Sequence, residues 1–95
     1  MVDDFAGGFI VTQHLIDEGY QRIAHLAGAQ HLMIYQDRKN GYMEVLRVNS
    51  IPYDETFVII NSLTSEDGIY AVKQFISLAN PPDALFCGND TTARV

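Results

Sequence analysis

Three short, mostly apolar runs constrain the fold of this 95-residue chain more than any other sequence feature. They are Ile23–Ala27, Phe57–Ile60 and Ala84–Cys87, and their first residues lie 34 and then 27 positions apart. Apolar runs without alternating polar residues are typical of strands covered on both faces of a parallel sheet. The spacing matches the roughly 30 residues of a strand–helix–strand unit. The sequence therefore predicts parallel strands joined by helices.

The segments that flank these runs carry apolar residues at helical spacing. In the first of them, Val11 and Leu15 lie four residues apart, and Gly19 follows as a helix stop signal. Before the third, Thr64 is followed by acidic residues, which suits a helix N-terminus. We predict helices over about residues 8–18, 37–48 and 64–79, and the beginning of a fourth helix over residues 89–95.

These elements predict an α/β protein of three layers, in which a Rossmann-like parallel sheet lies between helices. Three strands make a small sheet, and the last predicted helix is unfinished. We therefore expect residues 1–95 to form an incomplete part of a larger domain.

Composition excludes several classes of protein. With 6 Lys and Arg against 12 Asp and Glu, the formal net charge of −6 disfavours binding of a nucleic acid backbone by this chain itself. Cys87 is the single cysteine, so we expect a reduced, buried thiol without a disulfide bond. The histidines and this cysteine lack zinc-ligand spacing, so we expect no metal and no cofactor. Without a membrane-length apolar run or a basic signal region at Met1–Asp4, the chain is expected to be soluble and cytoplasmic.

We expect a ligand site at the carboxyl ends of the predicted strands, because ligands of parallel sheets bind there. Loops 28–36, 61–65 and 88–90 leave this edge. The chain has no serine or cysteine paired with a histidine at a catalytic spacing and no glycine-rich phosphate motif, so we expect binding rather than catalysis. The polar candidates can hold hydroxyls, amides or carboxylates, and they are Arg38, Asn61, Asn89 and Asp90.

An ordered set of short motifs runs through the whole chain. The set comprises Val2-Asp3-Asp4, Gly7-Gly8, His14-Leu15-Ile16, Gly19, Arg22-Ile23-Ala24, Leu26-Ala27-Gly28, Arg38, Gly41-Tyr42, Leu46, Ile51-Pro52, Glu66, Gly68, Pro82-Asp83-Ala84, Phe86-Cys87 and Asn89-Asp90. In this order and spacing it resembles the effector-binding region of lactose-repressor-type (LacI/GalR) transcriptional regulators. The resemblance covers essentially all 95 residues and implies the fold of periplasmic sugar-binding proteins.

The resemblance also implies which residues contact an effector. Arg38 matches the family arginine that commonly holds effector hydroxyls or a carboxylate. Asn89 and Asp90 match a pair at the edge of the effector cleft, and Leu63 stands where members often place an aromatic or apolar contact.

The domain organisation and function follow from the same resemblance. Residues 1–95 correspond to part of the C-terminal lobe of the effector-binding domain, and the helix-turn-helix DNA-binding domain lies outside this chain. The intact regulator is expected to be a cytoplasmic homodimer. It would bind a small metabolite, a sugar or sugar derivative, between two lobes and couple this binding to operator affinity.

Two other functions are compatible with an α/β pattern. A transport-type periplasmic sugar-binding protein has the same fold. A flavodoxin-like enzyme or a receiver domain is the more distant alternative, because Asp3 and Asp4 follow no strand and Lys73 lies inside a predicted helix.

Plainer roles also exist for the proposed site residues. Arg38 could be an exposed helix residue that pairs with Asp37 or Glu44. Asn89 and Asp90 could simply cap the last helix. The apolar stretch 32–35 is expected in a loop, where it packs against the other lobe or a second subunit, and Tyr35 could alternatively stack on a sugar.

Overall fold

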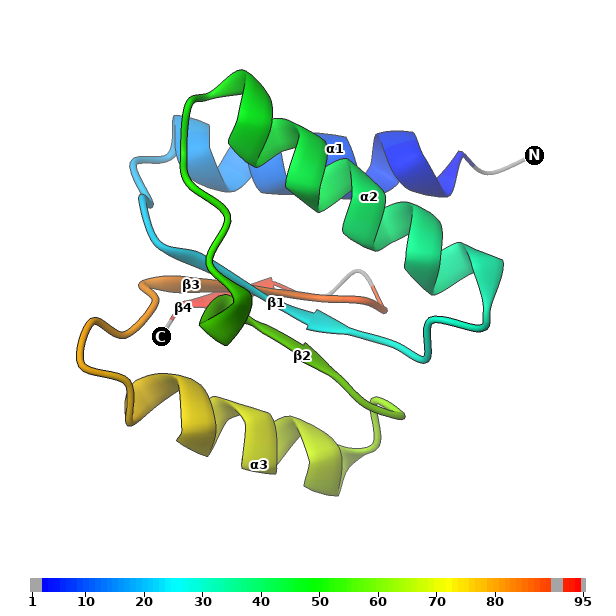
Figure 1. Ribbon diagram of the computed structural model, residues 1–95, viewed down its shortest axis with the longest axis vertical. Helices are drawn as coiled ribbons and strands as arrows, with labels where there is room; N and C mark the ends of the chain where they lie inside the picture. Colours follow the sequence, from blue (N-terminus) through cyan, green and yellow to red (C-terminus); the bar gives the residue numbers. More distant parts are fainter. Residues whose placement is uncertain (1–2, 90–91, 95) are drawn as a thin grey trace.

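The computed structural model describes residues 3–89 and 92–94, and the side chains of residues 3–89. A sheet lies between two helices on one face, α1 (Asp4–Asp17) and α2 (Met33–Val48), and one helix on the other, α3 (Ser65–Ile76) (Figure 1). The predicted three-layer α/β arrangement is therefore confirmed. Among these described helices, none is long and apolar enough to cross a membrane.

The sheet has the strand order β2-β1-β3-β4. β1 pairs in parallel with β2 and β3, so the predicted parallel sheet is confirmed, and β4 runs antiparallel to β3. In this register His25 stands opposite both Val58 and Phe86. The strands are β1 (Ile23–Ala27), β2 (Val58–Ile60), β3 (Ala84–Cys87) and β4 (Thr92–Arg94), and the first and third have the predicted bounds.

The fourth strand takes the place of the helix predicted over residues 89–95, and that prediction was wrong. Thr92 pairs with Phe86, and Arg94 pairs with Ala84. A helix of so few residues makes too few hydrogen bonds to offset the cost of its nucleation. A strand can instead use the open backbone groups along the edge of β3.

Two helices begin earlier than predicted. α1 begins directly after Asp3, whose carboxylate accepts a hydrogen bond from the Ala6 amide at 3.0 Å. α2 begins directly after Leu32, which makes no side-chain capping bond. Most of the apolar stretch predicted as a loop therefore lies in the first turn of α2, and Arg38 falls in the second turn.

β2 is shorter and more exposed than predicted. Phe57 belongs to a short 3-10 helix, Glu55–Phe57, and the strand begins after it. Ile60 is exposed because β2 is an edge strand of the described sheet. The prediction of a strand covered on both faces was therefore wrong for β2. It holds for β1, all of whose residues are buried.

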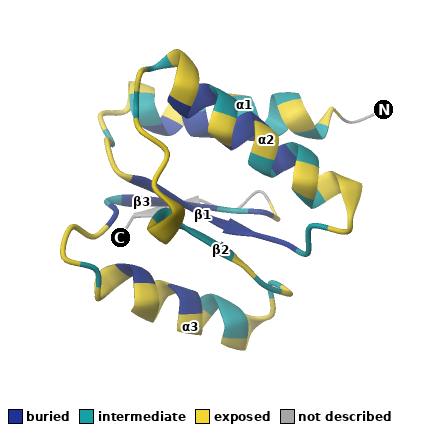
Figure 2. Cartoon of the chain, in the orientation of Figure 1, coloured by how far each residue is buried: buried dark blue, intermediate teal, exposed yellow. Residues whose placement is uncertain are grey.

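β1 and most of β3 are buried (Figure 2), and the core lies on both faces of the sheet because alternate residues of a strand point to opposite sides. The face under α1 and α2 buries Leu15, Ile23, Tyr42, Leu46, Ala84 and Phe86. The face over α3 buries Ala24, Leu26, Ala71, Phe75 and Leu85.

Two glycines let α1 and α2 cross at very close range. A Cβ atom on Gly41 would lie 2.3 Å from the carbonyl oxygen of Phe5, and one on Gly8 would lie 2.3 Å from that of Arg38. Only glycine permits such backbone contact. The crossing fixes the second turn of α2, which carries Arg38, against the beginning of α1.

Candidate ligand-binding site

The strand order creates a topological switch point at the carboxyl ends of β1 and β3. The connection after β1 leads to β2 on one side, and the connection after β3 leads to β4 on the other. Small ligands of open α/β sheets bind where neighbouring connections diverge in this way. Gly28 and Gly88 stand at this point, so close that a Cβ atom on Gly88 would lie 3.1 Å from the Gly28 nitrogen.

Arg38 extends from α2 to this edge and is only 8% exposed. Its guanidinium group donates a hydrogen bond to the carbonyl oxygen of Gly88. Its Nη2 atom lies 3.3 Å from Oδ1 of Asp4. A buried charge is costly unless it is paired and hydrogen-bonded, and these contacts supply both conditions.

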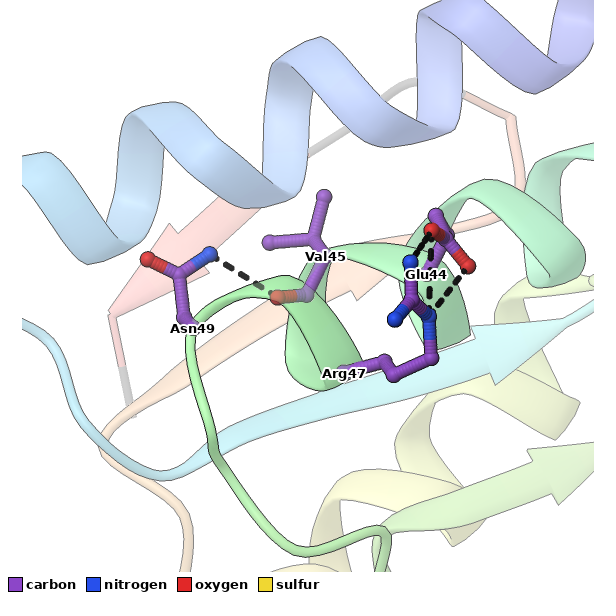
Figure 3. A network of polar contacts seen from close by, with 4 residues as sticks. All are labelled: Glu44, Val45, Arg47 and Asn49. Carbon is purple, nitrogen blue, oxygen red and sulfur yellow. Dashed lines mark hydrogen bonds and ion pairs between the residues drawn. The ribbon is translucent and has the colours of Figure 1, made fainter.

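The alternative that Arg38 is an exposed helix residue is therefore wrong. Glu44, one of the partners considered for it, forms an ion pair with Arg47 on the outer side of α2 (Figure 3). Arg47 is exposed, so α2 carries two arginines in contrasting environments, one buried at the strand edge and one on the surface.

Asp4 is a residue of the candidate site that the sequence patterns did not indicate, because it stands with Asp3 before the first predicted helix, where acidic residues commonly serve as caps. Asp3 does cap α1. Asp4 lies in the first turn of α1, where a carboxylate suits the helix dipole, and the α1–α2 crossing brings it to Arg38. The only sequence signal for this pairing was the pair of glycines that allows the two helices to meet.

Leu63 occupies the loop before α3 in a left-handed backbone conformation, with φ of 59°. Asn61, one of the predicted polar candidates, organises this loop. Its Oδ1 accepts a hydrogen bond from the Leu63 amide at 2.9 Å, and its Nδ2 donates to the Asp67 carbonyl at 3.3 Å. The Cδ1 atom of Leu63 would lie 3.4 Å from a Cβ atom on Gly88, so this side chain also faces the switch point.

Asn89 is exposed in the turn directly after Gly88. It does not begin a helix, so the capping alternative is wrong for Asn89. Asp90 lies outside the described residues. A depression of about 210 Å³ has a lining that comprises Leu26, Leu63, Thr64, Ser65, Gly68, Cys87 and Asn89. Complete small-molecule sites measure roughly 300–1,000 Å³, so this edge offers one wall of a site rather than a closed pocket.

The structure therefore gathers three of the four predicted site residues around Gly88. Arg38 comes from α2, Leu63 from the loop before α3, and Asn89 from the turn after β3. Tyr35 covers the other glycine of the switch point, since its ring occupies the position of a Gly28 Cβ atom.

Cys87 lies at the end of β3 and is half-buried rather than fully buried as expected. Burial raises the pKa of its thiol above the ordinary value, so the neutral thiol, a poor nucleophile, dominates at pH 7. Across residues 3–89, no group of three His, Cys, Asp or Glu side chains is placed to hold a metal ion.

Larger hollows exist as well, and the one beside α3 adjoins the depression next to Asn89, with which it shares Leu26, Ser65, Gly68 and Cys87. The groove of about 610 Å³ beside α3 has walls that comprise Leu26, Ser65, Gly68, Ile69, Val72, Lys73, Leu85 and Cys87. Most of these side chains are apolar and cannot position a hydroxyl or carboxylate by hydrogen bonds. The chemistry of the strand edge therefore makes it the better candidate for a polar ligand.

The whole chain, residues 1–95, matches the family model of periplasmic binding proteins and the sugar-binding domain of the LacI family. The transcriptional regulator CelR of Thermobifida fusca is 36% identical over 89 residues, which are 94% of this chain and 26% of CelR. The repressor CytR of Escherichia coli K12 is 30% identical over 92 residues, 97% of this chain and 27% of CytR. The chain thus spans about a quarter of the length of these curated relatives.

Solved structures show the same similarity. A putative LacI regulator from Bacillus cereus subsp. cytotoxis superposes with a TM-score of 0.86 at 26% identity, over 90% of this chain and 30% of that one. A CelR–cellobiose complex superposes with a TM-score of 0.84 at 36% identity, over 90% of this chain and 26% of CelR.

The sheet, its helices and these superpositions define an α/β lobe of the periplasmic-binding-protein type. This chain belongs to the family of periplasmic binding proteins and LacI sugar-binding domains, as its motifs indicated. The named relatives are transcription regulators rather than enzymes.

Proposed function

We propose that this chain is part of the C-terminal lobe of the effector-binding domain of a LacI-type transcriptional regulator, and that it contacts a sugar or sugar derivative at the switch point. The observation that carries this proposal is the meeting of Arg38, Leu63 and Asn89 around Gly88, although they come from three separate segments. The relative CelR, 36% identical, has been solved as a cellobiose complex, which supports a sugar as the class of effector.

The three side chains suit the parts of a sugar. The guanidinium group of Arg38 offers several donors in a fixed plane for hydroxyl or carboxylate oxygens. The amide of Asn89 both donates and accepts, as a sugar hydroxyl does. Leu63 offers an apolar surface for the C–H face of a sugar ring. A second lobe outside this chain would supply the opposite wall.

The proposed consequence of binding is a shift in the arrangement of the two lobes. An effector that binds one arrangement more tightly than the other increases the population of the first. In a homodimeric cytoplasmic regulator, this shift would change the affinity of a helix-turn-helix domain for operator DNA. The net charge of −6 supports DNA contact by another part of the protein.

Calorimetry on the full-length regulator, with cellobiose and a panel of sugars and sugar acids, tests the site. We expect saturable binding that Asn89→Ala weakens by about tenfold, a loss of ~1.4 kcal/mol. Asn89 is exposed, so this change should leave folding intact. Arg38→Ala should weaken binding at least as much, whereas Arg47→Ala, on the surface of the same helix, should leave affinity unchanged.

Equal affinity in the wild type and in both site variants would remove this edge from the binding site. A lack of binding across the panel would contradict a sugar effector. Operator release by the bound sugar, measured by gel shift, separates a regulator from a transport-type binding protein, which would bind the sugar without any operator.

A further inference from the structure

His25 is a buried polar residue that the proposed binding does not use. It lies in the middle of β1 and is 0% exposed. Its ring is stacked with those of Tyr42 of α2 and Phe86 of β3, with centroid distances of 5.1 and 4.6 Å. The imidazole therefore contacts two elements that lead into the candidate site.

The hydrogen bond of His25 defines its chemical state. Its Nδ1 atom lies 2.8 Å from the carbonyl oxygen of Phe86. A carbonyl oxygen can only accept, so Nδ1 carries the proton, and Nε2 of the neutral ring is an acceptor. Nε2 is buried and has no hydrogen-bond partner among the described residues.

Packing alone does not account for a histidine at this position. An aliphatic side chain would fill the space without burying an unsatisfied nitrogen. Two other buried polar side chains of this layer, those of Tyr42 and Thr12, are satisfied. Tyr42 donates to the Ile23 carbonyl at 2.6 Å, and Thr12 donates to the Gly8 carbonyl at 2.8 Å. The feature that distinguishes the histidine is its bond to Phe86.

That bond lies close to the candidate site. Phe86 is two residues before Gly88, whose carbonyl accepts from Arg38 and whose amide donates to the Leu26 carbonyl at 2.8 Å. His25 of β1 thus binds the Phe86 carbonyl, and Arg38 of α2 binds the Gly88 carbonyl two residues further along the chain. The turn that carries Asn89 begins directly after this segment.

We propose that His25 is a positioning residue: the Nδ1–H tautomer, bonded to the Phe86 carbonyl, fixes the end of β3 and so places the turn that presents Asn89 to the effector. The link to an effector rests on the proposed function. The placement of the turn does not rest on the proposed function, and it can be measured without a ligand.

Amide hydrogen exchange on this chain tests the proposal with two variants. His25→Leu removes the donor and keeps an apolar side chain, whereas His25→Asn keeps an N–H near the position of Nδ1. We expect the Leu variant to lower protection of the Gly88 amide at least about tenfold more than protection at the centre of β1. The Asn variant should restore much of this specific loss.

Phe75→Leu is the matched control, since Phe75 is a buried aromatic residue of α3 that packs on the opposite face of the sheet. It should lower protection across the sheet without singling out Gly88. The proposal is overturned if His25→Leu acts as uniformly as this control, or if the Asn variant rescues nothing.

A second measurement needs no variant. Long-range ¹H–¹⁵N correlations of the wild-type imidazole at pH 7 should show a neutral ring protonated on Nδ1. An Nε2–H tautomer or a charged ring would contradict the proposal. Failure of either experiment would leave the calorimetric test of sugar binding unaffected, and a negative calorimetric result would leave these measurements intact.

Discussion

Arg38 illustrates how a residue with a recognisable motif can have an unpredictable environment. The motif indicated an arginine near a ligand site, and the structure places it at the strand edge. Its burial and its pairing with Asp4 depend on the contact between two helices that are separated along the chain by β1. Apart from the two glycines at the helix crossing, the sequence contains no signal for a partner on another element, so the pairing with Asp4 was not predicted.

The charge of Asp4 should matter for stability. Asp4→Asn keeps the shape of the side chain and removes a charge that compensates the buried guanidinium group of Arg38. We expect the free energy of unfolding to fall by about 1–3 kcal/mol, measured by urea denaturation. Glu44→Gln, which weakens the exposed pair with Arg47, serves as the control and should leave the midpoint almost unchanged. Equal effects of the two changes would contradict a special role for the buried pair.

His25 should make stability depend on pH. Its pKa is lowered from the ordinary 6.5 to about 4, because burial and, to a smaller extent, the nearby charge of Lys39 outweigh the hydrogen bond to Phe86, which raises it. The unfolded chain therefore binds a proton near pH 6.5 that the folded chain binds only near pH 4. This contribution is fully present above pH 6.5 and is lost as the pH falls toward 4, by up to about 3 kcal/mol.

Urea denaturation at several pH values between about 5 and 7.5 measures this dependence. His25→Asn should flatten the curve in that range, because the titrating group is gone. His31→Gln removes an exposed histidine and should keep the wild-type slope. If the free energy of unfolding of the Asn variant changed with pH as steeply as that of the wild type, the pH dependence would come from other groups.

At the scale of the elements, predictions held where the signal was local. Gly19, with φ of +102°, ends α1, and Thr64 caps α3 by accepting from the Asp67 amide at 3.1 Å. α2 begins after Leu32, whose side chain caps nothing, so the sequence contained no start signal. β4 exists through its pairing with β3, and such long-range pairing is invisible to periodicity.

The crossing of α1 and α2 gives a prediction at this scale. Gly41→Ala would place a methyl group 2.3 Å from the Phe5 carbonyl, so the two helices must separate. We expect a loss of about 1–3 kcal/mol in thermal or urea unfolding. Gly7→Ala is the matched control on α1, because no described atom lies within 4 Å of its added Cβ. It should stabilise by about 0.5–1 kcal/mol, and a similar loss in both variants would rule out the close crossing as the cause.

At the scale of the molecule, the two faces of the sheet are unequally covered. Two helices lie over one face and only α3 over the other (Figure 1). The outer side of α3 stays exposed (Figure 2), with Ile69 at 58% and Ile76 at 53%. The groove of about 610 Å³ runs beside it. Contiguous apolar surface of this kind promotes association in water.

We therefore expect the 95-residue chain to associate with itself at high concentration through the α3 face. Ile69→Lys combined with Ile76→Glu should shift the population toward monomer, as measured by sedimentation velocity. Ile10→Lys changes an exposed isoleucine on α1, on the opposite side of the sheet, and should have little effect. A monomeric wild-type chain, or an equal effect of the α1 change, would contradict this prediction.

The fold and the site were thus predictable to different degrees. The layers, the parallel strands and the edge of the sheet that carries the candidate site follow from apolar runs such as Ala84–Cys87. The motifs added Arg38, Leu63 and Asn89. The left-handed conformation of Leu63 and the loop-forming role of Asn61 depend on hydrogen bonds formed only after folding, so no residue pattern predicted them.

The contacts of Arg38 also have an entropic consequence. A long, flexible side chain normally loses its rotamer freedom when a ligand arrives, at a cost of about 0.5–1.5 kcal/mol. Asp4 and Gly88 hold Arg38 through contacts within the folded chain itself, so folding has already met that cost. A ligand that contacts this preorganised donor keeps more of its gross interaction energy as affinity, which allows a small molecule with few functional groups to bind well.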